Sequence, residues 1–420
     1  MKQLFAKFLI LLLSLPLASV ANAEGIASQL FGQLKEMVYQ VRVIDLASGD
    51  KSVIGSGFRV TTDGHVATNF HVVAPFVHRP DNFRLEYVYH DGSAGGLELL
   101  GIDVIHDIAI VKIDNPSPDS FSFNSGPLAK GDRIYSMGNP HDLGMTIIEG
   151  NYNGLIKTSR YQKILFSGSL NGGMSGGPAI DENGRVIGVN VSKGGEQLSF
   201  LVPVKELKIL LDRVLAQGKT DDFEEEIRES LLSDQEKFFG PLLRQGWNSD
   251  PLMELSLPGQ ISESLKCWGH TLDDKDIRYE GVHQHCRSQD RIYLSKHLYT
   301  GTFFYDFEWA ATEKLNRFQF YNLLEKRYTH RGQGNVSKKE DATNYECHTD
   351  FIEVDKRSWR VSSCFRAYKK YTGLYDALLL LASIDTNHKG AIIKAGATGI
   401  SQDNAIALFR KFMESIKWPR

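Results

Sequence analysis

The sequence predicts an all-β domain built from antiparallel barrels, followed by an α+β domain that contains cysteine. Short apolar stretches alternate with glycine-bearing turns from about residue 38 to residue 204, a density typical of barrels rather than of a parallel sheet. All four cysteines lie in the second half of the chain, which is also rich in aromatic residues. The 420 residues are enough for two domains, and the net charge of −3 does not favour nucleic-acid binding.

The N-terminus has the features of an export signal. A positively charged leader precedes an apolar run over residues 8–20, and Ala-Asn-Ala at residues 21–23 supplies the small residues that signal peptidase accepts. The run is short for a bilayer span, although an uncleaved anchor is the alternative. We therefore expect a signal peptide over residues 1–23 and a soluble, exported protein without a membrane span, which is periplasmic or, alternatively, secreted.

The first domain is expected over residues 24–216. Its first strands are predicted over residues 53–60 and 64–69 and joined at Asp63-Gly64, a dipeptide that favours tight turns. Helical periodicity over residues 204–215 closes the domain. Further strands between these elements are predicted over residues 97–102, 107–113, 133–137 and 147–154.

A helical linker is expected over residues 217–255, and a C-terminal domain over residues 256–420. The second of these carries a weak internal duplication, with chance similarity as the alternative. Each half has a cysteine pair, then Tyr-Thr-Gly, then Tyr-Asp, and ends in a helical stripe. The two Tyr-Thr-Gly motifs lie at residues 299–301 and 371–373, and the two Tyr-Asp motifs at residues 305–306 and 375–376.

The cysteines favour disulfides because the chain is expected to be exported. Their spacing pairs neighbours in sequence, although four cysteines allow three connectivities. Zinc is the alternative, since histidines lie nearby, but the spacing matches no standard zinc pattern, so we expect no metal. The cysteines are Cys267, Cys286, Cys347 and Cys364, and the nearby histidines are His270, His285 and His348.

A turn of small residues, Gly173-Met174-Ser175-Gly176-Gly177-Pro178, indicates an exposed serine nucleophile. Glycine allows the sharp bend that lets the amides of Gly173 and Ser175 point at one developing oxyanion. Such turns are common, so the motif needs partners elsewhere in the chain.

Two upstream motifs supply those partners. His71 is the candidate base that takes the proton of Ser175 and later donates it to a leaving amine. Asp107 would hold the imidazole in the right tautomer, and the chain order His, Asp, Ser is one of the known triad orders. Asp103 is a rival carboxylate, but only Asp107 is followed directly by an apolar strand. The other histidines of this half are His65, His78, His106 and His141.

Four sequence blocks resemble the protease domain of Deg/HtrA-type trypsin-like serine proteases. The resemblance implies a two-barrel chymotrypsin-like fold with the site between the barrels. It also implies endopeptidase activity on protein or peptide substrates without a cofactor. The blocks are GSGFRVTTDGHVATNFHVV (residues 55–73), LLGIDVIHDIAIVKI (99–113), MGNPHDLGMTIIEG (137–150) and NGGMSGGPAIDENGRVIGVN (171–190).

The sequence also departs from this family. Met174 stands where Asn or Asp is usual, so the serine turn is expected to depend on packing. No PDZ-like glycine loop follows residue 215, so the C-terminal domain replaces the usual peptide-binding module. By its offset from the serine, Ser169 resembles the base of the specificity pocket, which favours small or medium aliphatic residues before the scissile bond. The expected pocket walls are Leu170, Val189, Asn190 and Val191. The last three of these could also pair with an extended substrate as an added strand.

Two other readings of the function stay open. One is a protease-like scaffold that binds peptides without cutting them. The other is a protein in which the C-terminal domain is the main actor and binds an envelope component or another protein, with proteolysis secondary.

Overall fold

The computed structural model describes residues 25–272, 277–328 and 337–418, and the predicted signal peptide lies outside them. The protease-like half contains two β-structures, and the first is a seven-stranded antiparallel sheet in the order β5-β4-β1-β2-β3-β7-β6. Its strands are β1 (Val38–Asp45), β2 (Lys51–Arg59), β3 (His65–Thr68), β4 (Phe83–Val88), β5 (Ala94–Gly96), β6 (Glu98–Asp103) and β7 (Ile108–Lys112).

This first sheet, called the first barrel below, differs from the expected closed barrel because its two end strands are not hydrogen-bonded to each other. The two end strands of the sheet, β5 and β6, are adjacent in the chain and separated only by Leu97. The amide of Leu97 donates to the carbonyl oxygen of Leu85 in β4 at 3.0 Å. The covalent chain therefore connects the two end strands of the sheet, and the sheet can curve without hydrogen bonds between β5 and β6.

The second β-structure is a closed barrel in the order β10-β13-β12-β11-β8-β9. Helices α1 (Ile26–Leu34) and α3 (Val204–Gln217), the second of which was predicted from its periodicity, bury leucines in a core shared with strands of both barrels. The barrel strands are β8 (Arg133–Gly138), β9 (Thr146–Leu155), β10 (Ile164–Phe166), β11 (Pro178–Ile180), β12 (Val186–Gly195) and β13 (Leu198–Pro203). The short 3-10 helices are η1 (Lys35–Met37), η2 (Pro80–Asn82) and η3 (Pro140–Asp142).

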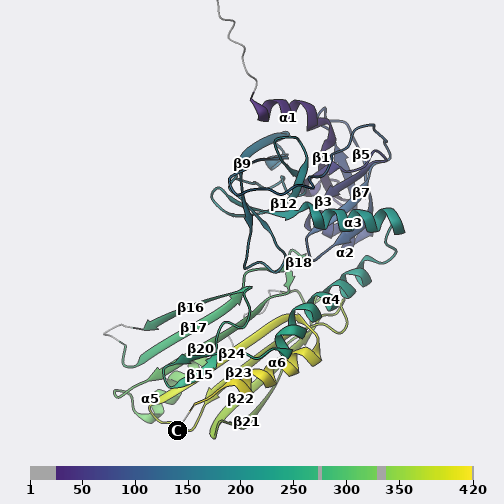
Figure 1. The fold of residues 1–420 in the computed structure, drawn as a ribbon. Helices are drawn as coiled ribbons and strands as arrows, with labels where there is room; N and C mark the ends of the chain where they lie inside the picture. The colour runs from purple at the N-terminus through teal and green to yellow at the C-terminus, as the bar shows by residue number, and fades with distance from the viewer. Residues whose placement is uncertain (1–24, 273–276, 329–336, 419–420) are drawn as a thin grey trace, which may run out of the picture.

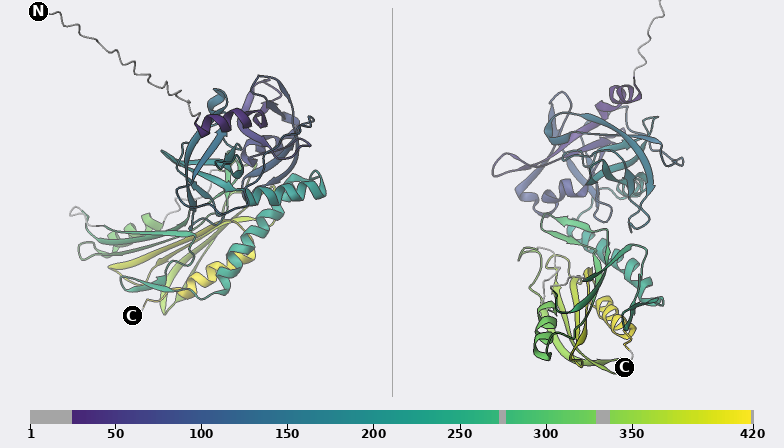
Figure 2. Two further views of the ribbon diagram at one scale, coloured as in Figure 1. Left: turned by 45° about the horizontal axis from the view of Figure 1, so that its top comes forward. Right: turned by 90° about the vertical axis from the view of Figure 1, so that its left-hand side faces the viewer.

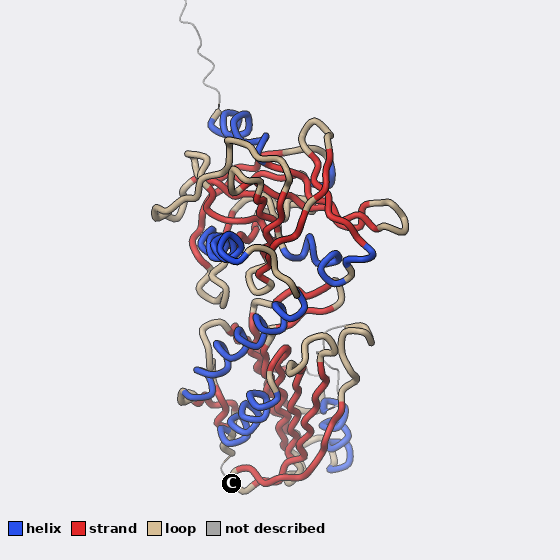
Figure 3. The backbone as a smooth tube through the Cα atoms, turned by 90° about the vertical axis from the view of Figure 1, so that its right-hand side faces the viewer, coloured by secondary structure: helices blue, strands red, loops and turns tan. Residues whose placement is uncertain are grey.

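Most of the expected linker is one long helix, α4 (Phe223–Arg244). The side chain of Asp222 caps it by accepting from the amides of Glu224 and Glu225, which satisfies donors that the first turn leaves free. The helix runs from the protease-like half along the C-terminal half (Figures 1 and 3). The hairpin of β14 (Ser249–Leu252) and β15 (Leu255–Pro258) follows it.

The C-terminal half is built on a seven-stranded antiparallel sheet in the order β16-β17-β20-β24-β23-β22-β21. Helix α5 (Arg317–Tyr328) lies on one face, while α4 and α6 (Gln402–Ser415) lie on the other (Figure 2). The strands are β16 (Leu265–Leu272), β17 (Glu280–Ser288), β20 (Phe303–Ala311), β21 (Glu346–Val354), β22 (Arg357–Ala367), β23 (Tyr375–Ser383) and β24 (Lys389–Ile400).

Two disulfides staple the outer hairpins of this sheet. Cys267 in β16 is bonded to Cys286 in β17, and Cys347 in β21 to Cys364 in β22. In each copy of the predicted repeat, the Tyr-Asp motif begins or lies in the strand next to the stapled hairpin, β20 or β23. The duplication stays a prediction. Within the described residues, no group of three or more His, Cys, Asp and Glu side chains could hold a metal ion.

The two halves share a hydrophobic core. A small hairpin, β18 (Ile292–Ser295) and β19 (Leu298–Thr300), packs against helix α2 (Phe70–His78) of the first barrel (Figure 1). Ile292 and Leu294 belong to the same buried cluster as Phe70 and Val73 of that helix. None of the helices in the described ranges has the length and apolar character needed to cross a membrane.

Candidate active site

Helix α2 positions His71 in its first turn, next to Asp107. The Asp107 carboxylate accepts from the backbone amide of His71 at 2.8 Å and lies 2.6 Å from its Nδ1. Asp107 adopts the left-handed region (φ 59°) at the start of β7, which turns its side chain back toward the helix. The side-chain amide of Asn69 donates to the Asp107 carbonyl oxygen at 2.7 Å. One carboxylate thus satisfies a free helix donor and orients the imidazole.

The pair is partly shielded from water, with side-chain exposures of 26% for His71 and 18% for Asp107. Burial disfavours the charged imidazole, but the negative charge of Asp107 and its hydrogen bond outweigh that effect. The pKa of His71 is therefore raised above its ordinary value. This geometry suits a base that must become an imidazolium during a reaction.

The rival carboxylate is engaged elsewhere. Asp103 lies 2.7 Å from Nδ1 of His106, and Glu206 of α3 lies 3.8 Å from the other ring nitrogen of His106. Burial lowers the pKa of His106, but Asp103 and Glu206 outweigh it and raise that pKa. The structure therefore groups Asp103 with His106 and brings Asp107 to His71.

The serine turn requires glycine at two positions. Gly173 has φ +95°, and a Cβ there would lie 2.3 Å from the carbonyl oxygen of Asn139. Gly176 has φ +86°, and a Cβ there would lie 2.3 Å from the carbonyl oxygen of Ser56. Among the described residues, the amides of Gly173 and Ser175 have no hydrogen-bond acceptor. Both donors are therefore available to an oxyanion.

Ser56 of β2 braces this turn from the first barrel. Its hydroxyl donates to the carbonyl oxygen of Gly173 at 2.7 Å, and its amide donates to the carbonyl oxygen of Ser175, also at 2.7 Å. Met174 between them is fully buried in the core of the second barrel. Packing thus anchors the position where the sequence lacks the usual polar residue.

The hydroxyl of Ser175 donates to the carbonyl oxygen of Val191 at 3.3 Å. No hydrogen bond between Ser175 and His71 is formed within the described part of the chain. Catalytic hydrogen bonds often tighten only when substrate binds. Attack would therefore require the hydroxyl to turn from Val191 toward the imidazole.

The expected walls of the specificity pocket are mostly buried instead. Leu170 and Val189 lie in the cores of the protease-like half and are 4% and 0% exposed. Asn190 is fully buried, and its side-chain amide donates to the carbonyl oxygens of Met137 and Met174 at 3.0 and 3.2 Å, so it braces the serine turn. Ser169 and Val191 remain half-buried. Strand β12 is buried through Asn190, and the assignment of these four residues to the pocket walls stays a prediction.

One residue near the site had no signal in the sequence. Tyr293, in β18 of the C-terminal half, places its ring edge-on to the His71 ring, with centroids 5.9 Å apart. Its ring also contacts Phe70, with centroids 6.4 Å apart. Burial, with smaller effects of Tyr299 and Asp107, raises the pKa of Tyr293 to about 12, so its hydroxyl stays neutral at ordinary pH. The C-terminal half thus contributes directly to the surroundings of the base.

The described geometry agrees with comparisons to known proteins. Residues 55–189 match the family described as "Trypsin-like peptidase domain". The chain is 32% identical over 179 residues to a probable periplasmic serine endoprotease DegP-like of Chlamydia trachomatis, covering 40% of this chain and 35% of that protein. It is 31% identical over 175 residues to a protein of the same description from Bartonella henselae, covering 39% and 34%.

The chain therefore spans about a third of the length of the curated relatives it matches. Among solved structures, the serine endoprotease from Yersinia pestis matches 47% of this chain and 68% of that chain, at 24% identity and a TM-score of 0.41. The family match includes the positions of His71, Asp107 and Ser175. Residues 55–189 are a trypsin-like peptidase domain of the Deg/HtrA type.

Proposed function

We propose that this protein is an exported serine endopeptidase that uses Ser175, His71 and Asp107 to cleave protein or peptide substrates. The observation that carries the proposal is the double contact of Asp107 with the amide and the imidazole of His71. It fixes the ring so that its other nitrogen can take a proton. The two free amides of the serine turn supply the second requirement, a site for negative charge.

The reaction follows from these groups. Ser175 Oγ attacks the substrate carbonyl carbon while His71 takes the hydroxyl proton. The amides of Gly173 and Ser175 bind the oxyanion, an effect worth about 3–4 kcal/mol per donor in such enzymes. The imidazolium then gives its proton to the leaving amine, and the C–N bond breaks. Water, deprotonated by the same base, hydrolyses the acyl-enzyme and releases the acid.

Export to the periplasm is supported by three observations, with secretion as the alternative. Residues 1–23 carry the features of a signal peptide. Both cysteine pairs are disulfide-bonded, a state that persists in oxidising compartments. The relatives from Chlamydia trachomatis and Bartonella henselae are described as periplasmic.

The test is covalent labelling of the full chain with a fluorophosphonate probe. We expect wild type and the control Ser93→Ala, which changes an exposed serine between β4 and β5, to label equally. Ser175→Ala should not label, because the probe needs an activated hydroxyl. Labelling that persists in Ser175→Ala would refute the assignment of the nucleophile.

A peptide-binding scaffold that does not cut is the second candidate function. The hydrogen bond of Ser175 to Val191 rather than to His71 favours it. Folded wild-type protein that fails to label, yet binds unfolded polypeptide, would support this candidate over the first.

A further inference from the structure

A cavity of about 520 Å³ lies between helix α2 and the β18–β19 hairpin, at the edge of the proposed triad. His71 and Ala74 line it from the first barrel, and Tyr293 and Leu298 line it from the C-terminal half. Figure 1 shows β18 directly beside α2, at the junction of the two halves. Nothing in the mechanism above uses this space.

The cavity lies along the path that a substrate takes from the nucleophile. Strand β2 contacts Ser175 at Ser56, and Ser52 and Val53 of the same strand line the cavity. Three or four residues of strand at about 3.3 Å each place the cavity roughly 10–13 Å from that contact. An extended peptide running beside β2 would therefore enter it three or four residues away from the scissile bond.

The position of His71 decides which side of the substrate enters. A general acid that protonates the leaving amine must lie next to it, so the departing segment passes the imidazole. His71 lines this cavity, whereas Ser169 and Val191, the half-buried residues expected to contact the other side of the substrate, do not. The cavity therefore faces the segment that follows the scissile bond.

The C-terminal wall is held firmly in place. The ring Nε2 of His78 in α2 lies 2.7 Å from the carbonyl oxygen of Leu294 and donates to it. Leu294 and Leu298 are buried in the core shared by both halves. A substrate thus meets a preformed wall, which lowers the ordering cost of binding.

The lining combines an apolar floor with an excess of positive charge. Val53, Phe83 and Leu298 supply apolar surface. Two lysines at the rim have carboxylate partners, Glu340 for Lys338 at 3.4 Å and Glu224 for Lys370 at 3.1 Å.

Two further cations at the rim, Arg79 and Lys296, form no ion pair with any described residue. The guanidinium of Arg79 lies over the Phe83 ring, 5.1 Å from its centroid. Lys296 occupies the exposed turn of the β18–β19 hairpin. Arg79 is partly compensated, because its charge, after the hydrogen bonds from Ser48 and Ala47, helps to lower the pKa of Asp45. Asp341 also lines the cavity, so Lys296 is the rim cation on which the excess positive charge mainly rests.

We propose that this cavity is a substrate subsite, built jointly by the protease domain and the β18–β19 hairpin. It binds an apolar side chain and a neighbouring carboxylate, three or four residues after the scissile bond. The carboxylate can belong to Asp or Glu or to the C-terminus of a short peptide. The inference rests on the proposed endopeptidase function and names the substrate class of that same site.

The test uses the full chain, first shown to label at Ser175, and a peptide library made from a digested proteome. Cleavage sites are read by mass spectrometry, once with free and once with amidated C-termini. We expect Asp and Glu to be enriched about two- to five-fold at the third or fourth position after the cut, as suits exposed ion pairs. Enrichment of cuts near free C-termini that disappears on amidation would assign the terminal carboxylate as ligand.

The variant Lys296→Glu should abolish or reverse this acidic preference. Lys208→Glu, which makes the same charge change on exposed α3 outside the cavity, should leave it unchanged. Labelled wild type that shows no acidic preference, or a preference that survives in Lys296→Glu, would overturn the subsite. Wild type that does not label would instead refute the proposed function.

Discussion

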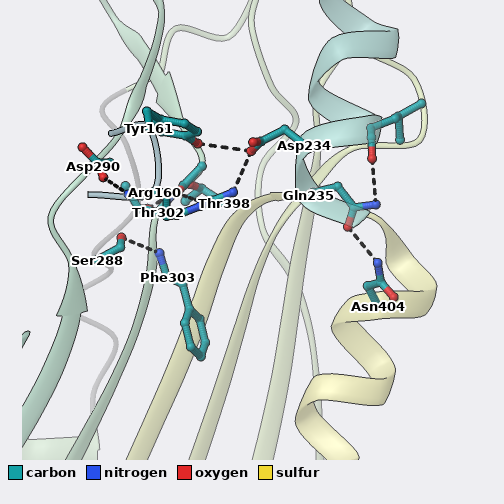
Figure 4. Close-up of polar contacts among 12 residues, drawn as sticks. Arg160, Tyr161, Asp234, Gln235, Ser288, Asp290, Thr302, Phe303, Thr398 and Asn404 are labelled. Carbon is teal, nitrogen blue, oxygen red and sulfur yellow. Dashed lines mark hydrogen bonds and ion pairs between the residues drawn. The ribbon is translucent and has the colours of Figure 1, made fainter. Parts of the chain in front are cut away.

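The junction between the two halves depends on a buried arginine in the loop between β9 and β10. Arg160 lies 2.7 Å from the carboxylate of Asp234 in α4 (Figure 4). It also donates to the carbonyl oxygen of Gly301 at 3.0 Å. Its guanidinium lies 4.1 Å from the ring centroid of Phe238. The side chains of Arg160 and Asp234 are only 9% and 14% exposed. We predict that Arg160→Ala strongly destabilises the protein.

The expected loss is about 3–5 kcal/mol, the cost of removing one partner of a buried ion pair and leaving the other charge unpaired. We expect the lower end, because the hydroxyl of Tyr161 still donates to Asp234 at 3.1 Å. The matched control is Arg133→Ala, whose ion pair with Glu149 is 3.6 Å long and 58% and 48% exposed. That change should cost less than about 1 kcal/mol.

Urea unfolding followed by two signals measures the effect. All five tryptophans lie after residue 246, so their fluorescence reports the C-terminal half, while Ser175 labelling reports the protease half. Both transitions should move together in Arg160→Ala. The double variant Arg160→Ala/Asp234→Ala should cost less than the sum of the single changes. If Arg160→Ala costs no more than Arg133→Ala, the buried ion pair does not stabilise the junction.

Two further predictions concern the triad and the disulfides. Asp107→Asn removes the charge that raises the pKa of His71 and leaves the burial that lowers it. The acidic limb of the pH–activity profile should therefore move to lower pH, and kcat should fall about 10⁴-fold. An acidic limb that does not move would contradict this prediction. Because the raised pKa stabilises the fold below the unfolded value near 6.5 and that contribution is lost as pH rises through the folded value, the variant should also lose its extra stability at acid pH. Replacing both Cys267 and Cys286 by Ala opens a loop of sequence separation 19, so the free energy of unfolding measured in urea should fall by about 3 kcal/mol. Fluorophosphonate labelling of the folded protein should not slow. Slower labelling would mean that this edge of the sheet supports the active site.

The sequence motifs predicted the parts of the site that local geometry determines. The glycine-rich turn exposes Ser175 through its own local backbone geometry. The motifs of His71 and Asp107 placed a base just after one predicted strand and a carboxylate at the start of another. The predicted strand over residues 107–113 begins at Ile108 instead, because Asp107 takes a left-handed conformation to reach the helix. The family resemblance supplied the pairing that local patterns lack.

Properties that depend on long-range packing could not be predicted in this way. Asn190 follows an apolar residue in a strand. The neighbouring residues in the sequence do not show that its side-chain amide donates hydrogen bonds to the carbonyl oxygens of Met137 and Met174 inside the barrel. Tyr293 is one of 16 tyrosines, and it contacts His71 only because a hairpin more than two hundred residues later packs on α2. Periodicity reports which face of an element is buried, but it does not report which distant element covers that face.

We predict that the shared core makes the C-terminal half support the proposed active site, and a pair of leucines can test this. Leu294 packs in the core with α2, whereas Leu265 packs in the C-terminal core, and both are 0% exposed. Replacing either by Ala should cost about 2–5 kcal/mol of unfolding free energy. Only Leu294→Ala removes packing beside Tyr293 and the helix that carries His71, so only it should slow fluorophosphonate labelling of the folded protein. If both variants label at the wild-type rate, the hairpin holds the two halves together without supporting the base.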